Sequence, residues 1–227
     1  MIDGDSIDQF DATTGALEHS FGPAMSNLYP AITISADRRT LFLGSVGSTG
    51  NIFEYDISTS TPALIAQLSG FYYGLAPSPD SKFLYYLHST AGSLLRARLP
   101  SLSPVRLVNS NPYFDDTGVG LEGSIYESVD PPEGSIHTPS GSYSIFDPIS
   151  LRQTAAIPLG NLQVDYPYYP GPIVFDNSGK YFFANVNTQQ EQEEIWVFST
   201  DLASYPPPKS PDKESSQCLH PGSGSKW

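Results

Sequence analysis

The segment Leu75-Ala-Pro-Ser-Pro-Asp80-Ser-Lys-Phe-Leu-Tyr-Tyr86 contains a short apolar stretch, a polar turn with an aspartate, and a second stretch of aromatic and aliphatic residues. Segments 32–43, around Asp37, and 173–183, around Asp176, have the same layout. Asp37 and Asp80 are 43 positions apart, and Asp80 and Asp176 are 96 apart. This spacing predicts a repeat of about 46 residues, with a further copy near Asp130.

Each copy is followed by two more strand-like stretches. The predicted third strands are residues 7–11, 52–56, 94–98, 143–147 and 195–199, and the predicted fourth strands are residues 16–21, 63–68, 105–108 and 154–159. No helical periodicity persists, and β-branched and aromatic residues fill the apolar runs. Four short strands in each period of 40 to 50 residues are typical of a β-propeller blade.

The order of these strands predicts an incomplete ring. The chain has 227 residues, whereas seven blades of this length need roughly 320. We therefore expect an all-β fold, with antiparallel four-stranded blades forming a partial ring of about four to five blades over residues 1–205. We expect the Pro-, Ser- and Gly-rich segment 206–227, which contains Cys218, to be a disordered tail. Open blade edges of this kind favour self-association.

Composition excludes several classes of protein. The net charge of −13 disfavours nucleic acids and anionic membranes as partners, and a single cysteine cannot form an intrachain disulfide. The sequence contains no run of 18 apolar residues, so it predicts no membrane-spanning helix. The first 25 residues contain Asp3, Asp5, Asp8 and Asp11, unlike a signal peptide, although the few lysines and many Ser, Tyr, Asn and Pro residues favour an extracytoplasmic location.

Two segments carry a family resemblance. Ser78-Pro79-Asp80-Ser81-Lys82-Phe83-Leu84-Tyr85 and Phe10-Asp11-Ala12-Thr13-Thr14-Gly15 resemble the repeats of YVTN-type propellers, within the wider WD40-like group that includes quinoprotein and lactonase-type enzymes. The resemblance spans residues 6–199 and implies the fold. The Tyr-Val-Thr-Asn tetrapeptide itself is absent, which leaves the subfamily open, and no catalytic residue is carried over.

The repeated aspartates have a local explanation. An aspartate carboxylate accepts hydrogen bonds from backbone N–H groups two residues further on and so fixes a tight turn. We therefore interpret Asp37, Asp80, Asp130 and Asp176 as structural turn residues. The alternative, a repeated calcium ligand, lacks a matching loop motif.

Aromatic residues gather in the predicted links between blades. With one histidine, they make a candidate ligand-binding rim at the loop end of the propeller, composed of Tyr29, Tyr72, Tyr73, His88, Tyr113, Tyr168 and Tyr169. Such a rim can stack on a glycan or hold a peptide. The alternative is that the tyrosines pack as wedges between blades and that His88 is a surface histidine.

The segment 111–122 is predicted to be the longest irregular link. Asp115, Asp116 and Glu122 offer oxygen ligands for Ca²⁺, and the alternative is a solvated acidic loop. No other cofactor is predicted.

Two functions are consistent with these patterns. The first is a non-catalytic propeller that binds a protein or a small-molecule or glycan ligand through its loop face. The second is a partial or degenerate enzyme of lactonase or quinoprotein type with a site in the axial channel, which requires titratable side chains converging on the axis.

Overall fold

The computed structural model describes residues 2–3, 6–22, 31–44, 50–70, 72–88, 93–109, 114–129, 142–158, 169–187 and 193–201. These residues form strands and turns, and none of them belongs to a helix long and apolar enough to cross a membrane. Tyr29, Tyr113, Asp130, Tyr168 and the predicted tail lie outside the described residues.

The strands form five antiparallel sheets, which we number as blades 1 to 5 in chain order. Blade 1 has three strands, β1 (Ile2–Asp3), β2 (Ser6–Phe10) and β3 (Leu17–Phe21). Blade 2 has four, β4 (Ala31–Ile34), β5 (Thr40–Gly44), β6 (Asn51–Asp56) and β7 (Ala63–Ser69). Blade 3 also has four, β8 (Tyr72–Pro77), β9 (Phe83–His88), β10 (Ser93–Arg98) and β11 (Ser103–Asn109).

Blade 4 contains β12 (Phe114–Val119), β13 (Ile125–Val129), β14 (Ser142–Phe146) and β15 (Gln153–Pro158). Blade 5 contains three described strands, β16 (Tyr169–Phe175), β17 (Tyr181–Asn187) and β18 (Glu193–Ser199). The predicted all-β propeller fold is therefore confirmed, and β1 is an additional second strand in blade 1 that the sequence pattern did not predict.

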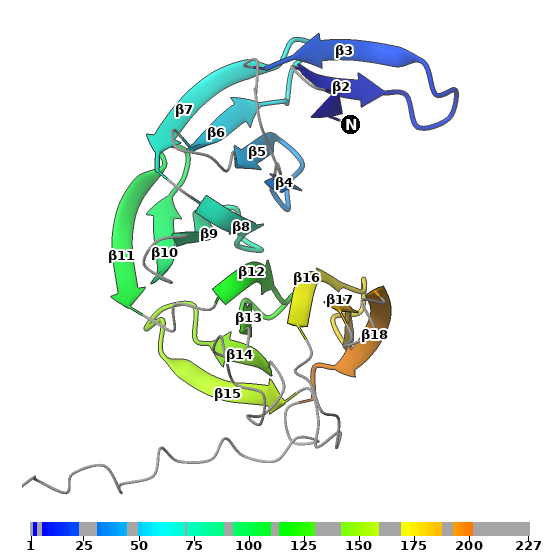
Figure 1. The fold of residues 1–227 in the computed structure, drawn as a ribbon. Helices are drawn as coiled ribbons and strands as arrows, with labels where there is room; N and C mark the ends of the chain where they lie inside the picture. Colours follow the sequence, from blue (N-terminus) through cyan, green and yellow to red (C-terminus); the bar gives the residue numbers. More distant parts are fainter. Residues whose placement is uncertain are drawn as a thin grey trace, which may run out of the picture.

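The five blades form an open arc (Figure 1). The first strands of blades 2 to 5 are β4, β8, β12 and β16, and they lie next to one another along the inside of the arc. Among the described strands, no hydrogen-bonded ladder joins blade 1 to blade 5. The expectation of a partial ring is confirmed.

The hydrophobic core lies between blades, because each central strand presents side chains alternately to the two faces of its sheet. On β5, Phe42 points to the forward face, which we define as the face toward the next blade, and contributes to a cluster with Leu84 of blade 3. Leu41 and Leu43 point to the rear face and contribute to a cluster with Ile7 of blade 1. Each blade is therefore stabilised by burying apolar side chains on its neighbours.

Glu54 is an exception within this apolar packing. It pairs with Phe42 across the β5–β6 ladder, lies on the same forward face and is buried. Neither of its carboxylate oxygens has a hydrogen-bond partner among the described residues. Burial therefore raises the pKa of Glu54 from 4.5 to about 7, because the charged form loses its hydration.

We predict that ionisation of the buried Glu54 carboxyl lowers the free energy of unfolding as the pH rises. The folded protein holds this proton up to about pH 7, whereas the unfolded chain releases it near 4.5, so the stability contribution declines between these values. Urea unfolding is expected to show a loss of about 2–3 kcal/mol between pH 5 and pH 8. Glu54→Gln should remove most of this slope, whereas Glu18→Gln, at an exposed position, should leave it unchanged. An unaltered slope in Glu54→Gln would contradict the assignment.

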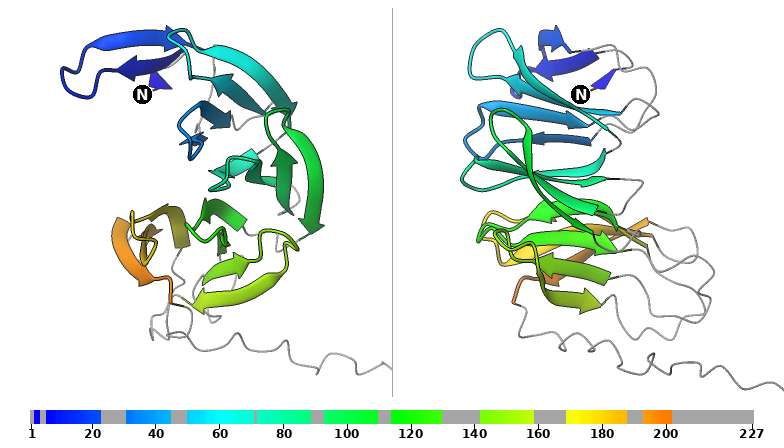
Figure 2. Two further views of the ribbon diagram at one scale, coloured as in Figure 1. Left: turned by 180° about the vertical axis from the view of Figure 1, so that it is seen from behind. Right: turned by 90° about the vertical axis from the view of Figure 1, so that its left-hand side faces the viewer.

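The turns between first and second strands share one backbone geometry. In each turn, the N–H of the fourth residue donates to the carbonyl of the first, and the fourth residue has a positive φ: Arg38 (59°), Ser81 (55°), Gly123 (94°) and Gly179 (69°). The first residues are therefore Ser35, Ser78, Gly120 and Asp176. All the turns between first and second strands, and those between third and fourth strands, lie together on one side of the stack (Figure 2).

This alignment refines the interpretation of the aspartates. In blade 2, the Ser35 hydroxyl donates to the Asp37 carboxylate at 2.6 Å, and in blade 3, Ser78 donates to Asp80 at 2.7 Å. In blade 5, the two residue types are exchanged, because Ser178 donates to Asp176 at 2.5 Å. Asp176 therefore occupies the serine position of the turn and is not equivalent to Asp37 and Asp80.

The exchanged pair preserves the hydrogen bonds of the turn. Asp176 accepts the N–H of Tyr181 at 2.9 Å, as Ser78 accepts that of Phe83 at 3.0 Å. The hydroxyl of the neighbouring serine is the main cause that holds the pKa of Asp37, of Asp80 and of Asp176 below the usual value. These turns are accordingly expected to weaken in acid, when the carboxylates become protonated.

The structure differs from the prediction in blade 4. Segment 111–122 was expected to be an irregular link, but β12 occupies residues 114–119 and the turn between first and second strands lies at Gly120–Ser124, not around Asp130. Two features explain why the sequence pattern did not predict β12. A change of register between Phe114 and Thr117 accommodates the two aspartates, and a Cβ at Gly118 would lie 3.1 Å from side-chain atoms of Ile173.

We predict that the exchanged pair in blade 5 can be reversed. Asp176→Ser and Ser178→Asp should each lower the Tm by about 2–4 °C. Asp176→Ser removes the carboxylate that accepts the hydrogen bonds of the turn, and Ser178→Asp places a second carboxylate next to that of Asp176. The double variant D176S/S178D recreates the arrangement of blades 2 and 3 and should recover most of the wild-type Tm. Additive losses in the double variant, measured by thermal unfolding, would contradict the equivalence.

Candidate functional site

The first strands line an apolar groove along the inside of the arc. The groove has a volume of about 640 Å³ and is lined by residues 31–34, 75–77, 117–120 and 173–175. It extends to Ala36, Pro79 and Leu121 at the turns that follow these strands. Thr33 and Thr117 are the polar side chains among its described lining residues, and the Thr117 hydroxyl donates to Glu127 at 2.5 Å.

Blade 1 leaves part of this groove open. Ile32 and Ile34 of β4 pair with Leu43 and Leu41 and therefore lie on the rear face of blade 2. Their partners are buried, but Ile32 and Ile34 are each 49% exposed. The described part of blade 1 has β1 to β3 and no first strand beside β4, so these isoleucines remain accessible to a ligand.

The groove offers apolar contact area and no described titratable side chain. An apolar concave surface of this kind can bind aliphatic or aromatic groups, and orientation then depends on a small number of polar contacts.

A second, smaller hollow of about 270 Å³ lies between blades 3 and 4 beside Arg96. The Arg96 Nη1 donates to the carbonyl of Pro148 at 2.6 Å, and its Cζ lies 4.7 Å from the centre of the Phe83 ring. The Tyr85 hydroxyl also donates to the Pro148 carbonyl, at 3.3 Å. The two hydrogen bonds to Pro148 connect blades 3 and 4, whereas the contact with Phe83 lies within blade 3, so the guanidinium has a structural role here.

Two residues of the predicted rim, Tyr72 and His88, are cross-strand partners in the structure, and Tyr169 lies two blades further along the arc. Tyr72 and Tyr73 lie at the start of β8, Tyr169 lies at the start of β16, and His88 pairs with Tyr72 at the end of β9. Tyr72, Tyr73 and Tyr169 therefore lie within strands and not in the predicted links between blades, at the end of the groove-lining strands opposite the turns at Pro79 and Leu121. The side chains of these four residues are not among those described, and Tyr29, Tyr113 and Tyr168 lie outside the described residues.

The calcium hypothesis stays a prediction. Asp115 and Asp116 lie in β12 with side chains outside the described set, whereas Glu122 is exposed in the following turn and accepts the Tyr126 hydroxyl at 3.4 Å. Within the part of the chain that the structure describes, no group of three or more His, Cys, Asp or Glu residues could hold a metal ion.

A second series of aspartates was not recognised in the sequence as turn residues. Asp11 and Asp147 directly follow third strands and Asp56 is the last residue of one, and each accepts the N–H of a residue two positions further on. Hydrogen bonds lower the pKa of all three: from the Thr14 side chain for Asp11, from the Ser58 side chain for Asp56 and from the Ser150 backbone for Asp147. An aspartate directly after the aromatic residue in three of the five third strands was the available signal.

These features define the class of protein as a β-propeller with an open inner groove. The fold is similar to that of hydrazine synthase from Kuenenia stuttgartiensis, with a TM-score of 0.67 and 17% sequence identity, over 88% of this chain and 58% of that chain. The chain therefore spans little more than half of that neighbour. In total, 658 chains of solved structures match, so the fold alone does not specify a function. No family model and no curated protein matches the sequence.

Proposed function

We propose that the chain is a non-catalytic β-propeller module that binds a protein or a small ligand. The groove is the described part of its binding surface. The observation that carries this proposal is the apolar lining of the groove, together with the accessible Ile32 and Ile34. Exposed, contiguous apolar surface in a soluble fold is typical of an interaction site.

The predicted rim extends this proposal. Tyr72, Tyr73 and Tyr169 lie in the same strands as the groove lining, towards their opposite ends. A ligand held in the groove can therefore continue toward these residues, where tyrosine supplies both stacking area and a hydroxyl. Self-association through open blade edges also stays a prediction.

The alternative proposal is a partial propeller enzyme of lactonase or quinoprotein type. It requires acidic, basic or nucleophilic groups converging on the axis. Because the described lining of the groove supplies apolar residues and two threonines, we favour binding over catalysis at this surface.

The proposal predicts selective loss of binding when charge enters the groove. Peptides selected by phage display on the full chain should be rich in Leu, Ile, Val and Phe. Their affinity should fall at least tenfold for the double variant I32E/I34E, because binding would bury two carboxylates in an apolar environment.

The matched control is L64E/I65E, on the outer strand of the same blade, where the two residues are 51% and 46% exposed. This variant should retain peptide binding in the same titration. Equal losses in both double variants, or unchanged binding in I32E/I34E, would contradict the assignment of the groove as the binding surface.

A further inference from the structure

The carboxyl group of Glu54 is buried in the interface between blades 2 and 3. Its side chain is 1% exposed, and neither oxygen has a hydrogen-bond partner among the described residues. On the forward face of blade 2, its cross-strand partners are Phe42 and Ala66, and Ile52 lies two residues before it on β6. These three residues contribute to the apolar cluster that contains Leu84 of blade 3 or pack against it. Apolar side chains of two blades therefore enclose the carboxyl group.

The equivalent positions in the following blades hold different side chains. The ladders make Glu54 equivalent to Arg96 in blade 3, Ile145 in blade 4 and Val197 in blade 5. The Arg96 guanidinium donates to the carbonyl of Pro148, and the two aliphatic side chains require no polar partner. The carboxyl group of Glu54 has no such partner within the described residues. A buried polar group of this kind costs stability, so packing alone does not explain Glu54.

The cluster around Glu54 also forms part of the groove wall. Leu75 of β8 belongs to the cluster and Ala31 of β4 packs against it, and both residues line the groove. Thr33, another lining residue, pairs with Phe42, which in turn pairs with Glu54, so these three residues form one row across blade 2. The groove wall between blades 2 and 3 therefore depends on the packing around Glu54.

Titratable groups near this interface have other partners or lie at its ends. On the facing strands and adjoining turns they are Arg39 and Asp56 from blade 2, and Tyr72, Lys82, Tyr86 and His88 from blade 3. Arg39 acts on Asp56, whose pKa it lowers, and the Lys82 ammonium pairs with Asp80 at 3.1 Å. The side chains of Tyr72 and His88 are outside the described set, and Tyr86 is buried in the cluster. Burial is the cause that raises the pKa of Glu54 to about 7.

We propose that protonation of Glu54 regulates ligand binding in the groove. This proposal rests on the groove being the binding surface. The neutral acid is compatible with a closed, dry interface, whereas the carboxylate requires water. Ionisation of Glu54 therefore loosens the contact between blades 2 and 3, and with it the wall that contains Leu75. A ligand that contacts both β4 and β8 favours the closed interface, so its binding is coupled to the uptake of a proton.

The first test is a titration of groove-binding peptides against the full chain between pH 5 and pH 8. The peptides are acetylated, amidated and free of Asp, Glu, His and Cys, so that they do not titrate in this range. The dissociation constant of the wild type should rise about fivefold or more with increasing pH, because a larger share of Glu54 is ionised.

Two variants and a control assign this dependence to Glu54. Glu54→Gln keeps the position neutral and should bind at pH 8 as the wild type binds at pH 5. Glu54→Leu should also remove the dependence, which keeps the test decisive if Glu54→Gln does not fold. Glu18→Gln, at an exposed position on β3, is the matched control and should retain the dependence of the wild type.

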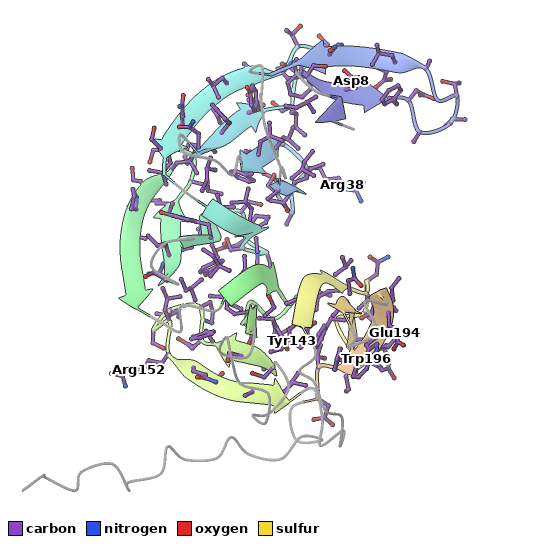
Figure 3. The ribbon with its side chains drawn as sticks, viewed as in Figure 1. Asp8, Arg38, Tyr143, Arg152, Glu194 and Trp196 are labelled. Atoms are coloured by element: carbon purple, nitrogen blue, oxygen red, sulfur yellow. The ribbon has the colours of Figure 1, made fainter. Side chains whose placement is uncertain are left out.

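The second test needs no ligand. Hydroxyl-radical footprinting at pH 5 and pH 8 compares oxidation of Leu75 in the groove wall with oxidation of Tyr143. Tyr143 is a suitable reference because it contacts Phe182 and Phe198 between blades 4 and 5, in a cluster whose described members include no acid (Figure 3). The ratio should increase at pH 8 in the wild type and stay constant in Glu54→Gln.

The outcomes separate this proposal from the groove assignment. An equal pH dependence of peptide binding in the wild type and in both Glu54 variants would overturn the proposal and leave the groove assignment standing. A ratio of Leu75 to Tyr143 oxidation that is the same at both pH values would also overturn it. Unchanged binding in I32E/I34E would contradict the groove assignment and the regulation of binding together, and the footprint would still show whether Glu54 controls the interface.

Discussion

Each blade in this fold is apolar on both faces, and neither face can be buried within a single sheet. Side chains of one strand alternate between the two faces, so a central strand such as β9 contributes Leu84 and Tyr86 to one interface and Tyr85 and Leu87 to the next. Blade stacking is therefore the interaction on which the core, the groove and the open ends all depend. The inner groove exists because the first strands are held at a fixed spacing by this stacking. The outward faces of blades 1 and 5 are exposed because no described blade packs on them.

The alternation also explains how much of the fold could be predicted from the sequence. Third and fourth strands have regular apolar and aromatic positions, and all the predicted ones correspond to strands of the structure. The strand β12 was not predicted, because Asp115, Asp116 and Gly118 interrupt its apolar pattern. Its conformation depends on a change of register and on the close approach of Ile173, which are properties of the folded neighbours.

The turns show a similar limit. Matching aspartate to aspartate aligned Asp176 with Asp37, although the hydrogen bonds make Asp176 equivalent to Ser35. A carboxylate and a hydroxyl two residues apart can exchange positions because each can accept the required N–H bonds.

The candidate site was predicted less completely. Tyr72, Tyr73 and Tyr169 were expected in the links between blades, but the structure has them in β8 and β16. The groove was not predicted, because small and aliphatic residues such as Ala76 and Ile34 carry no sequence signal of binding.

The account depends most directly on the claim that one second-strand position, two residues after the carbonyl that closes the turn (Thr40, Phe83, Ser124 and Tyr181), is buried in blades 2 to 4 and exposed in blade 5. Hydroxyl-radical footprinting of the chain at submicromolar concentration, read out by mass spectrometry, measures this at Phe42, Tyr85, Tyr126 and Phe183. Oxidation of Phe183 with protection of the other three is the predicted result. Equal protection of all four positions would show that blade 5 is covered within the single chain, and equal oxidation would show that the blades do not stack; either result would contradict the account.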